Sequence, residues 1–365
     1  MDTSLDSARP ADTIDRLLDW PDAALPTVAT ILGLRRYWMG PLFARLRREY
    51  EVATGDAPPA SQEEAFPVVQ ALPTAPYFQW LHRHIQEMTW AACDRIVAER
   101  LPAIEAALAP RPDDLGSLEA DPGLAYPGYY LFDFHRQAGG IWRDAAGAAV
   151  YLLGARLVHV GRNTDFQLHD KFVADLGLQV PPARVLDLGC GFGKTTFSLA
   201  RAWPEAEVIG LDVAEPCLRL GRRMATERGL AIHWRQAAIE ALPEADGSAD
   251  LVTCTMVLHE MPEAAIAGSF REAARVLKPG GLFVTLENRL LGDPFRDVLL
   301  AWYSQLIDEP YWEPFRHLDL PRMARQAGFA EAELRPWHPP GADPAADADP
   351  RRWATPWGMM IARKG

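Results

Sequence analysis

The chain has 365 residues, of which 48% are apolar and 24% charged, the ordinary balance of a soluble globular protein with room for one large domain and a smaller one. Its net charge of −12 argues against a nucleic-acid substrate, because phosphate backbones are held by clustered Lys and Arg. No uninterrupted apolar run approaches the ~20 residues needed to cross a bilayer, which argues against a membrane-spanning helix.

The N-terminus and the cysteines indicate a reducing compartment. The first residues, Met1-Asp-Thr-Ser-Leu-Asp6, are acidic and lack the basic and apolar regions of a signal peptide. The four cysteines, at positions 93, 190, 217 and 254, form no C-x-x-C pair. We therefore expect a cytoplasmic protein with buried thiols, no disulfide and no metal site.

Residues 1–150 have the apolar spacing of amphipathic helices. Apolar side chains recur at three- and four-residue intervals over 35–51, 75–108 and 144–157. Proline-rich joints at 57–59 and 109–113 separate these segments. The pattern predicts an N-terminal helical domain that serves as a substrate cap or a dimerisation region.

This part ends with a dense cluster of functional side chains. It comprises Tyr126-Pro-Gly-Tyr-Tyr130 and Asp133-Phe-His-Arg-Gln-Ala-Gly-Gly-Ile-Trp142. We consider Tyr129, Tyr130, His135 and Gln137 to be candidates for binding an acceptor substrate in a loop that precedes a helix. An equally weighted alternative is a tight joint between domains, in which the aromatic rings pack and the diglycine makes a turn.

Residues 151–365 alternate strands with helices, which predicts a mostly parallel sheet covered by helices on both faces. The most informative segment is Val185-Leu-Asp-Leu-Gly-Cys-Gly-Phe-Gly193, an apolar strand that runs into three alternate glycines. A second apolar strand ends on Asp212, where a carboxylate can accept hydrogen bonds from both ribose hydroxyls. The dinucleotide fingerprint would need glycine at Lys194, and a phosphate-binding P-loop would need glycine at Leu188.

An acid followed by G-x-G-x-G resembles the first motif of the class I S-adenosylmethionine-dependent methyltransferases of the small-molecule type. The resemblance covers 151–365, because a helix over 215–228, a strand over 249–255 and a Lys278-Pro-Gly-Gly281 turn before a strand follow in the expected order. It implies a doubly wound, Rossmann-like sheet whose last strand is antiparallel. We expect the low-complexity stretch 339–350 to be the exposed, mobile loop between the last two strands.

The resemblance also implies a cofactor, S-adenosyl-L-methionine, and the residues that hold it. Asp187 and the backbone of Gly189, Gly191 and Gly193 would bind the amino acid end of the cofactor, and Asp212 the ribose. Val213 would pack beside the adenine, and the amide of Ile239 would reach the adenine ring. Family members often carry an aspartate for the adenine amino group where this chain has Ala238, and Glu240 is only a weak substitute.

His259 is the candidate catalytic residue. The segment Leu258-His-Glu-Met-Pro262 follows the fourth strand of the fold and resembles the L-H-D-W turn of small-molecule O-methyltransferases, in which the histidine removes the acceptor proton. A neutral imidazole has a pKa near working pH, which suits a general base. The alternative is a structural turn histidine, as in quinone C-methyltransferases. Glu260 would orient His259 only if the two side chains converge.

The predicted function is methyl transfer to an O, N or S atom of a small molecule. A second aromatic cluster, at 308–317, includes Tyr311 and would cover the acceptor site. A homodimer through the helical part is expected only by analogy with O-methyltransferases. Two alternatives remain open: a regulator that binds the cofactor without transferring methyl, and an enzyme of another class, such as a quinone-type C-methyltransferase or a non-methyl transferase.

Overall fold

The structure is a computed structural model that describes residues 13–158, 163, 165–289, 292–343, 345 and 349–365. The acidic N-terminal residues 1–6 and part of the low-complexity stretch 339–350 lie outside the described residues. Within the described part, eight strands form a sheet of order β1-β4-β3-β2-β5-β6-β8-β7. The strands are β1 (Ser117–Glu119), β2 (Arg184–Leu188), β3 (Glu207–Asp212), β4 (His233–Gln236), β5 (Ala249–Thr255), β6 (Leu277–Asn288), β7 (Phe329–Trp337) and β8 (Trp357–Lys364).

The α-helices of the same residues are α1 (Ile14–Leu17), α2 (Leu25–Tyr37), α3 (Phe43–Thr54), α4 (Gln62–Gln70), α5 (Ala75–Leu108), α6 (Ala145–Val158), α7 (Gln167–Ala174), α8 (Lys194–Ala202), α9 (Glu215–Glu227), α10 (Glu263–Val276), α11 (Pro294–Leu306), α12 (Trp312–Arg316) and α13 (Leu320–Gln326). Both the predicted helix over 75–108 and the predicted strand over 249–255 are confirmed. The predicted helix over 35–51 is instead divided by a π-helical turn, Trp38–Leu42, which contains Pro41. Proline lacks the amide hydrogen that a continuous α-helix needs at that position.

The sheet has the predicted doubly wound topology. β1 to β6 run parallel, and β8 is antiparallel to both β6 and β7. The chain passes from β2 to β3 on one side and later returns to β5 on the other, so a crevice opens at the carboxyl ends of these central strands. The predicted long connection between the last two strands is also confirmed.

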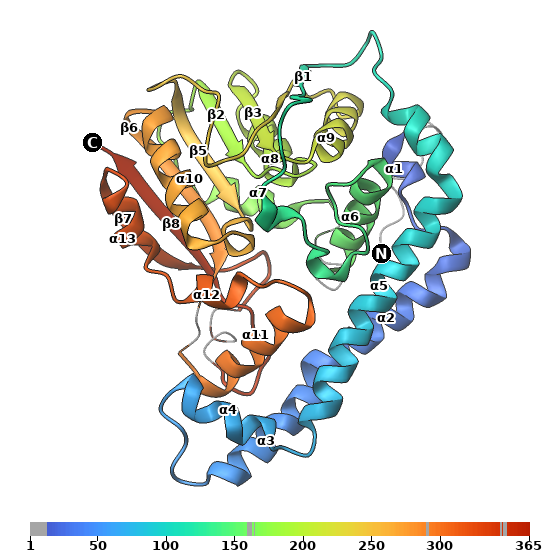
Figure 1. Ribbon diagram of the computed structural model, residues 1–365, viewed down its shortest axis with the longest axis vertical. Coiled ribbons are helices and arrows are strands. Elements are labelled where there is room, and N and C mark those ends of the chain that lie inside the picture. The colour runs from blue at the N-terminus through green and yellow to red at the C-terminus, as the bar shows by residue number, and fades with distance from the viewer. Residues whose placement is uncertain (1–12, 159–162, 164, 290–291, 344, 346–348) are drawn as a thin grey trace.

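Both faces of the central strands β2, β3 and β5 are buried, which is why these strands are mainly apolar. Along β2, Val185 belongs to the core cluster under α8 and α9, whereas Leu186 and Leu188 belong to the cluster under α10. Figure 1 shows α10 and α13 covering the sheet beside β8, and α9 beside β3.

The N-terminal helices form an arm along the molecule. In Figure 1, α2 runs beside the long helix α5, and the arm ends where α3 and α4 lie against α11. A third apolar cluster fills this end and joins Phe43 and Phe78 of the arm to Phe295 and Trp302 of α11. The segment therefore buries its apolar face partly on an insertion in the C-terminal region.

The N-terminal part also reaches the sheet, because β1 pairs with β4 at its edge and α6 packs against α9. The division into domains at residue 150 stays a prediction. All four cysteines are buried and unpaired, as expected. None of the helices in the described ranges is long and apolar enough to span a membrane.

Candidate active site

The turn after β2 presents backbone to the crevice. Gly189, Gly191 and Gly193 all have positive φ, of 63°, 54° and 101°, which glycine adopts without a Cβ penalty. The amide of Gly191 donates a 2.8 Å hydrogen bond to one oxygen of Asp212, at the end of β3. The other Asp212 oxygen accepts from the amide of Ala214, at 2.8 Å. Asp212 therefore ties the glycine turn to the start of α9.

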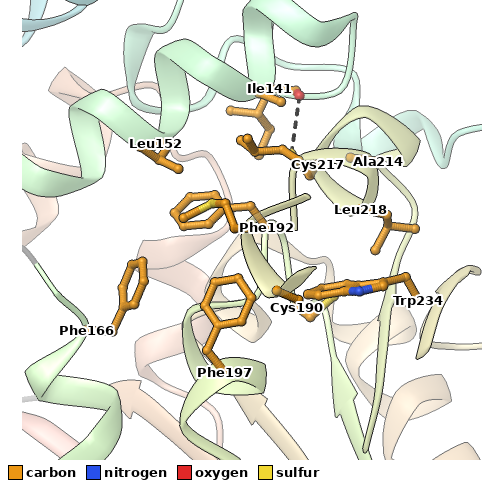
Figure 2. Close-up of a cluster of buried hydrophobic side chains, with 14 of the residues drawn as sticks. Ile141, Leu152, Phe166, Cys190, Phe192, Phe197, Ala214, Cys217, Leu218 and Trp234 are labelled. Carbon is orange, nitrogen blue, oxygen red and sulfur yellow. Dashed lines mark hydrogen bonds between the residues drawn. The ribbon is translucent and has the colours of Figure 1, made fainter. Parts of the chain in front are cut away.

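A tryptophan behind the turn explains why glycine is needed at Gly193 of the turn and at Gly221 of α9. A Cβ on Gly193 or Gly221 would lie 2.4 or 2.7 Å from the ring of Trp234, which is fully buried. Figure 2 shows the Trp234 ring in the same buried cluster as Cys190 and Phe197. Close packing against the indole of Trp234 thus fixes the position of the glycine turn.

The acidic residues of the turn fit a cationic ligand. Asp187 is 1% exposed and accepts hydrogen bonds from Thr196 and Thr253, at 2.7 and 2.8 Å. Burial raises the pKa of Asp187 to about 6, against the opposing effect of the two threonine hydroxyls. Burial also raises the pKa of Asp212. Neither carboxylate has a basic side-chain partner among the described residues, so a ligand with a sulfonium and an ammonium group would supply the missing positive charge.

The remaining cofactor candidates lie around Asp212. The carbonyl of Val213 accepts from Gln236, and Ile239 is buried in the apolar core. Tyr129 donates a 2.7 Å hydrogen bond to Glu240, and its pKa is raised by burial, by this bond and by the charges of Glu240 and Asp212. The tyrosine loop of the N-terminal part therefore reaches the crevice beside Glu240 and Asp212.

A cavity of about 570 Å³ opens between the N-terminal arm and the carboxyl edge of the sheet. Tyr151 and Lys194 border it at the glycine turn, and their side chains form a 3.0 Å hydrogen bond. Met256, which follows β5 with a positive φ of 57°, forms another part of the wall. Its left-handed backbone is the kind of strained geometry that clusters at functional sites.

Two histidines and three glutamates meet at one end of this cavity. His259 Nδ1 lies 2.6 Å from Glu287 Oε2, and His135 Nδ1 lies 2.7 Å from Glu309 Oε1. Each histidine also makes one longer contact through its other ring nitrogen. His259 Nε2 lies 3.8 Å from Glu309, which links the two His–Glu pairs, and His135 Nε2 lies 3.7 Å from Glu260. All except Glu287 line the cavity. In the described part of the chain, no group of three or more such side chains has the arrangement of a metal site.

The carboxylates change the protonation of the cluster. Burial lowers the pKa of His259, but the charge and hydrogen bond of Glu287 outweigh this effect and raise the pKa to about 9. The pKa of His135 is raised in the same way by Glu309. Burial raises the pKa of Glu260 to about 7, although both histidines oppose the shift. The cluster therefore titrates across the neutral range.

The structure brings only some of the sequence candidates to the cavity. His135 and His259 line it, while Tyr130 packs in the apolar core and Gln137 donates to the carbonyl of Gly147. Tyr311 contacts the ring of Tyr129, with 6.5 Å between centroids.

Sequence reasoning passed over the two carboxylates that hold the histidines. Glu287 is the next-to-last residue of β6, the strand beside β5, so the shared carboxyl edge of neighbouring parallel strands was a usable signal. Besides accepting from His259, Glu287 accepts from the amides of Val257 and Leu258, at 2.8 Å each. It therefore fixes the whole turn that carries His259.

Residues 185–281 match a family described as a methyltransferase domain. The demethylmenaquinone methyltransferase of Thermus thermophilus is 41% identical over 31% of this chain and 50% of its own length. The ubiquinone biosynthesis O-methyltransferase of Bordetella avium is 30% identical over 45% of this chain and 69% of its own length. A solved structure, phosphoethanolamine N-methyltransferase 2 of Haemonchus contortus in complex with S-adenosyl-L-methionine, is 15% identical with a TM-score of 0.45, over 67% of this chain and 61% of that one.

The chain spans about half the length of the first two curated relatives that it matches. The match over two thirds of the Bordetella protein, together with the motif order and the topology of the sheet, assigns the family. The chain belongs to the S-adenosylmethionine-dependent methyltransferases.

Proposed function

We propose that this protein transfers a methyl group from S-adenosylmethionine to an O, N or S atom of a small molecule held in the 570 Å³ cavity. When bound, the cofactor supplies an electrophilic methyl group on a sulfonium. The observation that carries the proposal is the position of His259. This residue faces the cavity immediately after β5, the strand next to the β2 that leads into the glycine turn.

The cofactor would lie along the glycine turn. Asp212 retains free lone pairs on both oxygens after accepting two amide hydrogen bonds, so it can also accept from ribose hydroxyls. Asp187 lies directly before the turn, where its negative charge favours an ammonium group. Tyr129 and Glu240 would close the adenine side.

His259 would remove a proton from the acceptor. Its Nδ1–H donates to Glu287, which fixes the ring and leaves Nε2 as the nitrogen that faces the acceptor. The nearest carboxylate to Nε2 is Glu309, at 3.8 Å, which is too long for a hydrogen bond. With this arrangement the imidazole can accept a proton, and Glu287 stabilises the resulting cation.

The raised pKa of His259 determines the pH dependence. With a pKa of about 9, the ring is mainly protonated at neutral pH, and its basic form grows as the pH rises. The methyl-transfer rate should therefore increase from pH 7, reach half of its maximum near pH 9, and level off only above about pH 10. A group such as Glu260, with a pKa of about 7, would instead give a plateau from pH 8 upwards.

The test is to incubate the pure protein with methyl-labelled cofactor and a metabolite extract, and to follow label in small molecules. His259→Ala should lower kcat by about 10²- to 10⁴-fold, the usual loss for a general base, while leaving cofactor affinity unchanged. His317→Ala is the matched control, because His317 is exposed. A change of less than threefold for His259→Ala would contradict its role as the base. Binding of the cofactor without transfer of label to any small molecule would contradict the proposed methyl transfer and favour a regulator that only binds the cofactor.

A further inference from the structure

A buried arginine lies on the cavity wall without a carboxylate partner. Arg35, on α2, is 7% exposed and lines the cavity. Among the described residues its guanidinium makes one hydrogen bond, from Nη2 to Oε1 of Gln86 on α5 at 3.1 Å. Its Nε has no hydrogen-bond partner. No described Asp or Glu lies within ion-pair distance of this guanidinium.

Other buried arginines of the chain are neutralised. Arg223 lies 2.7 Å from Asp114, and Arg316 lies 2.8 Å from Asp297. Burial of an isolated charge is expensive unless an opposite charge or several hydrogen bonds compensate for it. Burial lowers the pKa of Arg35 without removing its charge, since an arginine remains protonated in proteins. The position therefore lacks an anion that other buried arginines have.

The groups beside Arg35 do not supply this anion. His82 lies next to it on the wall and has a pKa lowered to about 3 by burial and by the charge of Arg35, so its ring is neutral. Neither ring nitrogen of His82 has a hydrogen-bond partner. The charge of Arg35 lowers the pKa of Tyr303, but burial has the larger effect and raises this pKa to about 12. The hydroxyl of Tyr303 is therefore neutral as well. These neutral polar groups can hydrogen-bond to an anion without repelling it.

A line of aromatic rings connects this end of the cavity with the histidine end. His82 stacks on Tyr303 with centroids 4.5 Å apart, and Tyr303 meets Trp312 at 5.1 Å. Trp312 in turn lies 5.3 Å from the ring of His259. All four rings line the cavity. A molecule lying along this wall would have an apolar body, one end at Arg35 and the other at His259.

We propose that the methyl acceptor carries a carboxylate that pairs with Arg35, while its nucleophilic atom lies at His259. The inference rests on the proposed function and names the class of its substrate. A planar guanidinium matches the two oxygens of a carboxylate. Of the other Arg and Lys side chains on the wall, Arg156 is paired with Asp15, and Lys194 bonds to Tyr151 at the glycine turn. Arg352 is exposed and is paired with Asp349 at 3.6 Å. One unpaired guanidinium suits a singly charged group better than a phosphate dianion.

The experiment uses the full chain, methyl-labelled cofactor and a metabolite extract, with labelled products separated on an anion exchanger at pH 8. The labelled product should be retained, and pretreatment of the extract with phosphatase should leave its amount unchanged. Arg35→Met should lower kcat/KM for the retained acceptor by about ten- to 100-fold, the range for a lost charge-assisted pair. Affinity for S-adenosylhomocysteine should stay the same.

Two further variants separate this effect from loss of folding. Arg36→Met removes the exposed neighbour of Arg35 on the same helix and should behave as wild type. Arg35→Lys keeps the charge but not the planar fork, so it should fold and still lose about tenfold in kcat/KM.

Several results would overturn the inference. An uncharged or cationic product, a product that disappears after phosphatase treatment, or wild-type kinetics of both Arg35 variants would each do so while leaving methyl transfer intact. Absence of any labelled product from a protein that binds S-adenosylhomocysteine is a different result, since it would contradict the proposed function itself.

Discussion

The pKa values of Asp187 and His259 are both raised, but for different reasons: burial raises that of Asp187, and a neighbouring carboxylate raises that of His259. Asp187 is enclosed with hydroxyl partners only, so burial raises its pKa to about 6 and part of its charge is lost in weak acid. His259 is equally enclosed, but Glu287 raises its pKa to about 9. The sequence predicts both residues, because each lies next to a motif at a strand end. The segment 308–317, which contains Glu309, is expected from the sequence to cover the acceptor site, but its aromatic pattern does not single out Glu309, which follows Asp308 with a positive φ of 56°.

The pKa of Asp187 leads to a prediction about cofactor affinity. If the ammonium of the ligand binds the ionised carboxylate, affinity for S-adenosylhomocysteine should fall about tenfold from pH 7 to pH 5, where about a tenth of Asp187 is ionised. The sign follows from the raised pKa, since protonation at low pH removes the attractive charge. Calorimetric titrations at the two pH values measure it.

Asp187→Asn is the matched variant, because it keeps the shape and removes the titrating group. This variant should bind S-adenosylhomocysteine more weakly at pH 7, and its affinity should change much less between pH 7 and pH 5. The pH dependence that remains would come from Asp212, whose pKa is also raised. Equal wild-type affinity at both pH values would rule out Asp187 as the partner of the ammonium.

At the scale of elements, close packing between α9 and β4 fixes the glycine turn. Trp234 of β4 fills the space left by Gly193, Gly210 and Gly221, so three elements meet at one indole ring. Regular elements such as α5 and β5 were predictable from apolar spacing alone. The three-residue β1 was not, because its formation depends on pairing with β4 and not on local pattern.

Two helical glycines should respond in opposite ways to alanine. In Gly221→Ala the new methyl would lie 2.7 Å from Trp234 and 2.8 Å from the carbonyl oxygen of Phe192, so overpacking should lower the free energy of unfolding by about 1–3 kcal/mol. Gly33, in α2, has no atom within 4 Å of an added Cβ. Gly33→Ala should raise the free energy of unfolding by up to about 1 kcal/mol through helix propensity. Urea unfolding of the two variants measures both changes in the free energy of unfolding. A loss of stability in Gly33→Ala, with none in Gly221→Ala, would contradict the packing described for the two glycines.

At the scale of the whole molecule, the cavity is built by parts that are distant in sequence. The N-terminal arm supplies Arg35 and His82, the loop before α6 supplies His135, and the carboxyl edge of the sheet supplies His259. The sequence predicts the arm and the sheet separately, from helical spacing and from motif order. It cannot predict which face of α2 or α5 meets the sheet edge, because that depends on packing between segments with no shared local pattern.

The central claim is that the glycine turn and Asp212 form an S-adenosylmethionine site beside this cavity. Titration calorimetry with S-adenosylhomocysteine tests it most directly. We expect one site per chain and a loss of about tenfold or more in affinity for Asp212→Ala, since hydrogen bonds to a charged group contribute about 1.5–3 kcal/mol. Asp212→Asn, which keeps one acceptor oxygen, should lose less. Unchanged affinity in Asp212→Ala, or preferential binding of NAD, would contradict the claim.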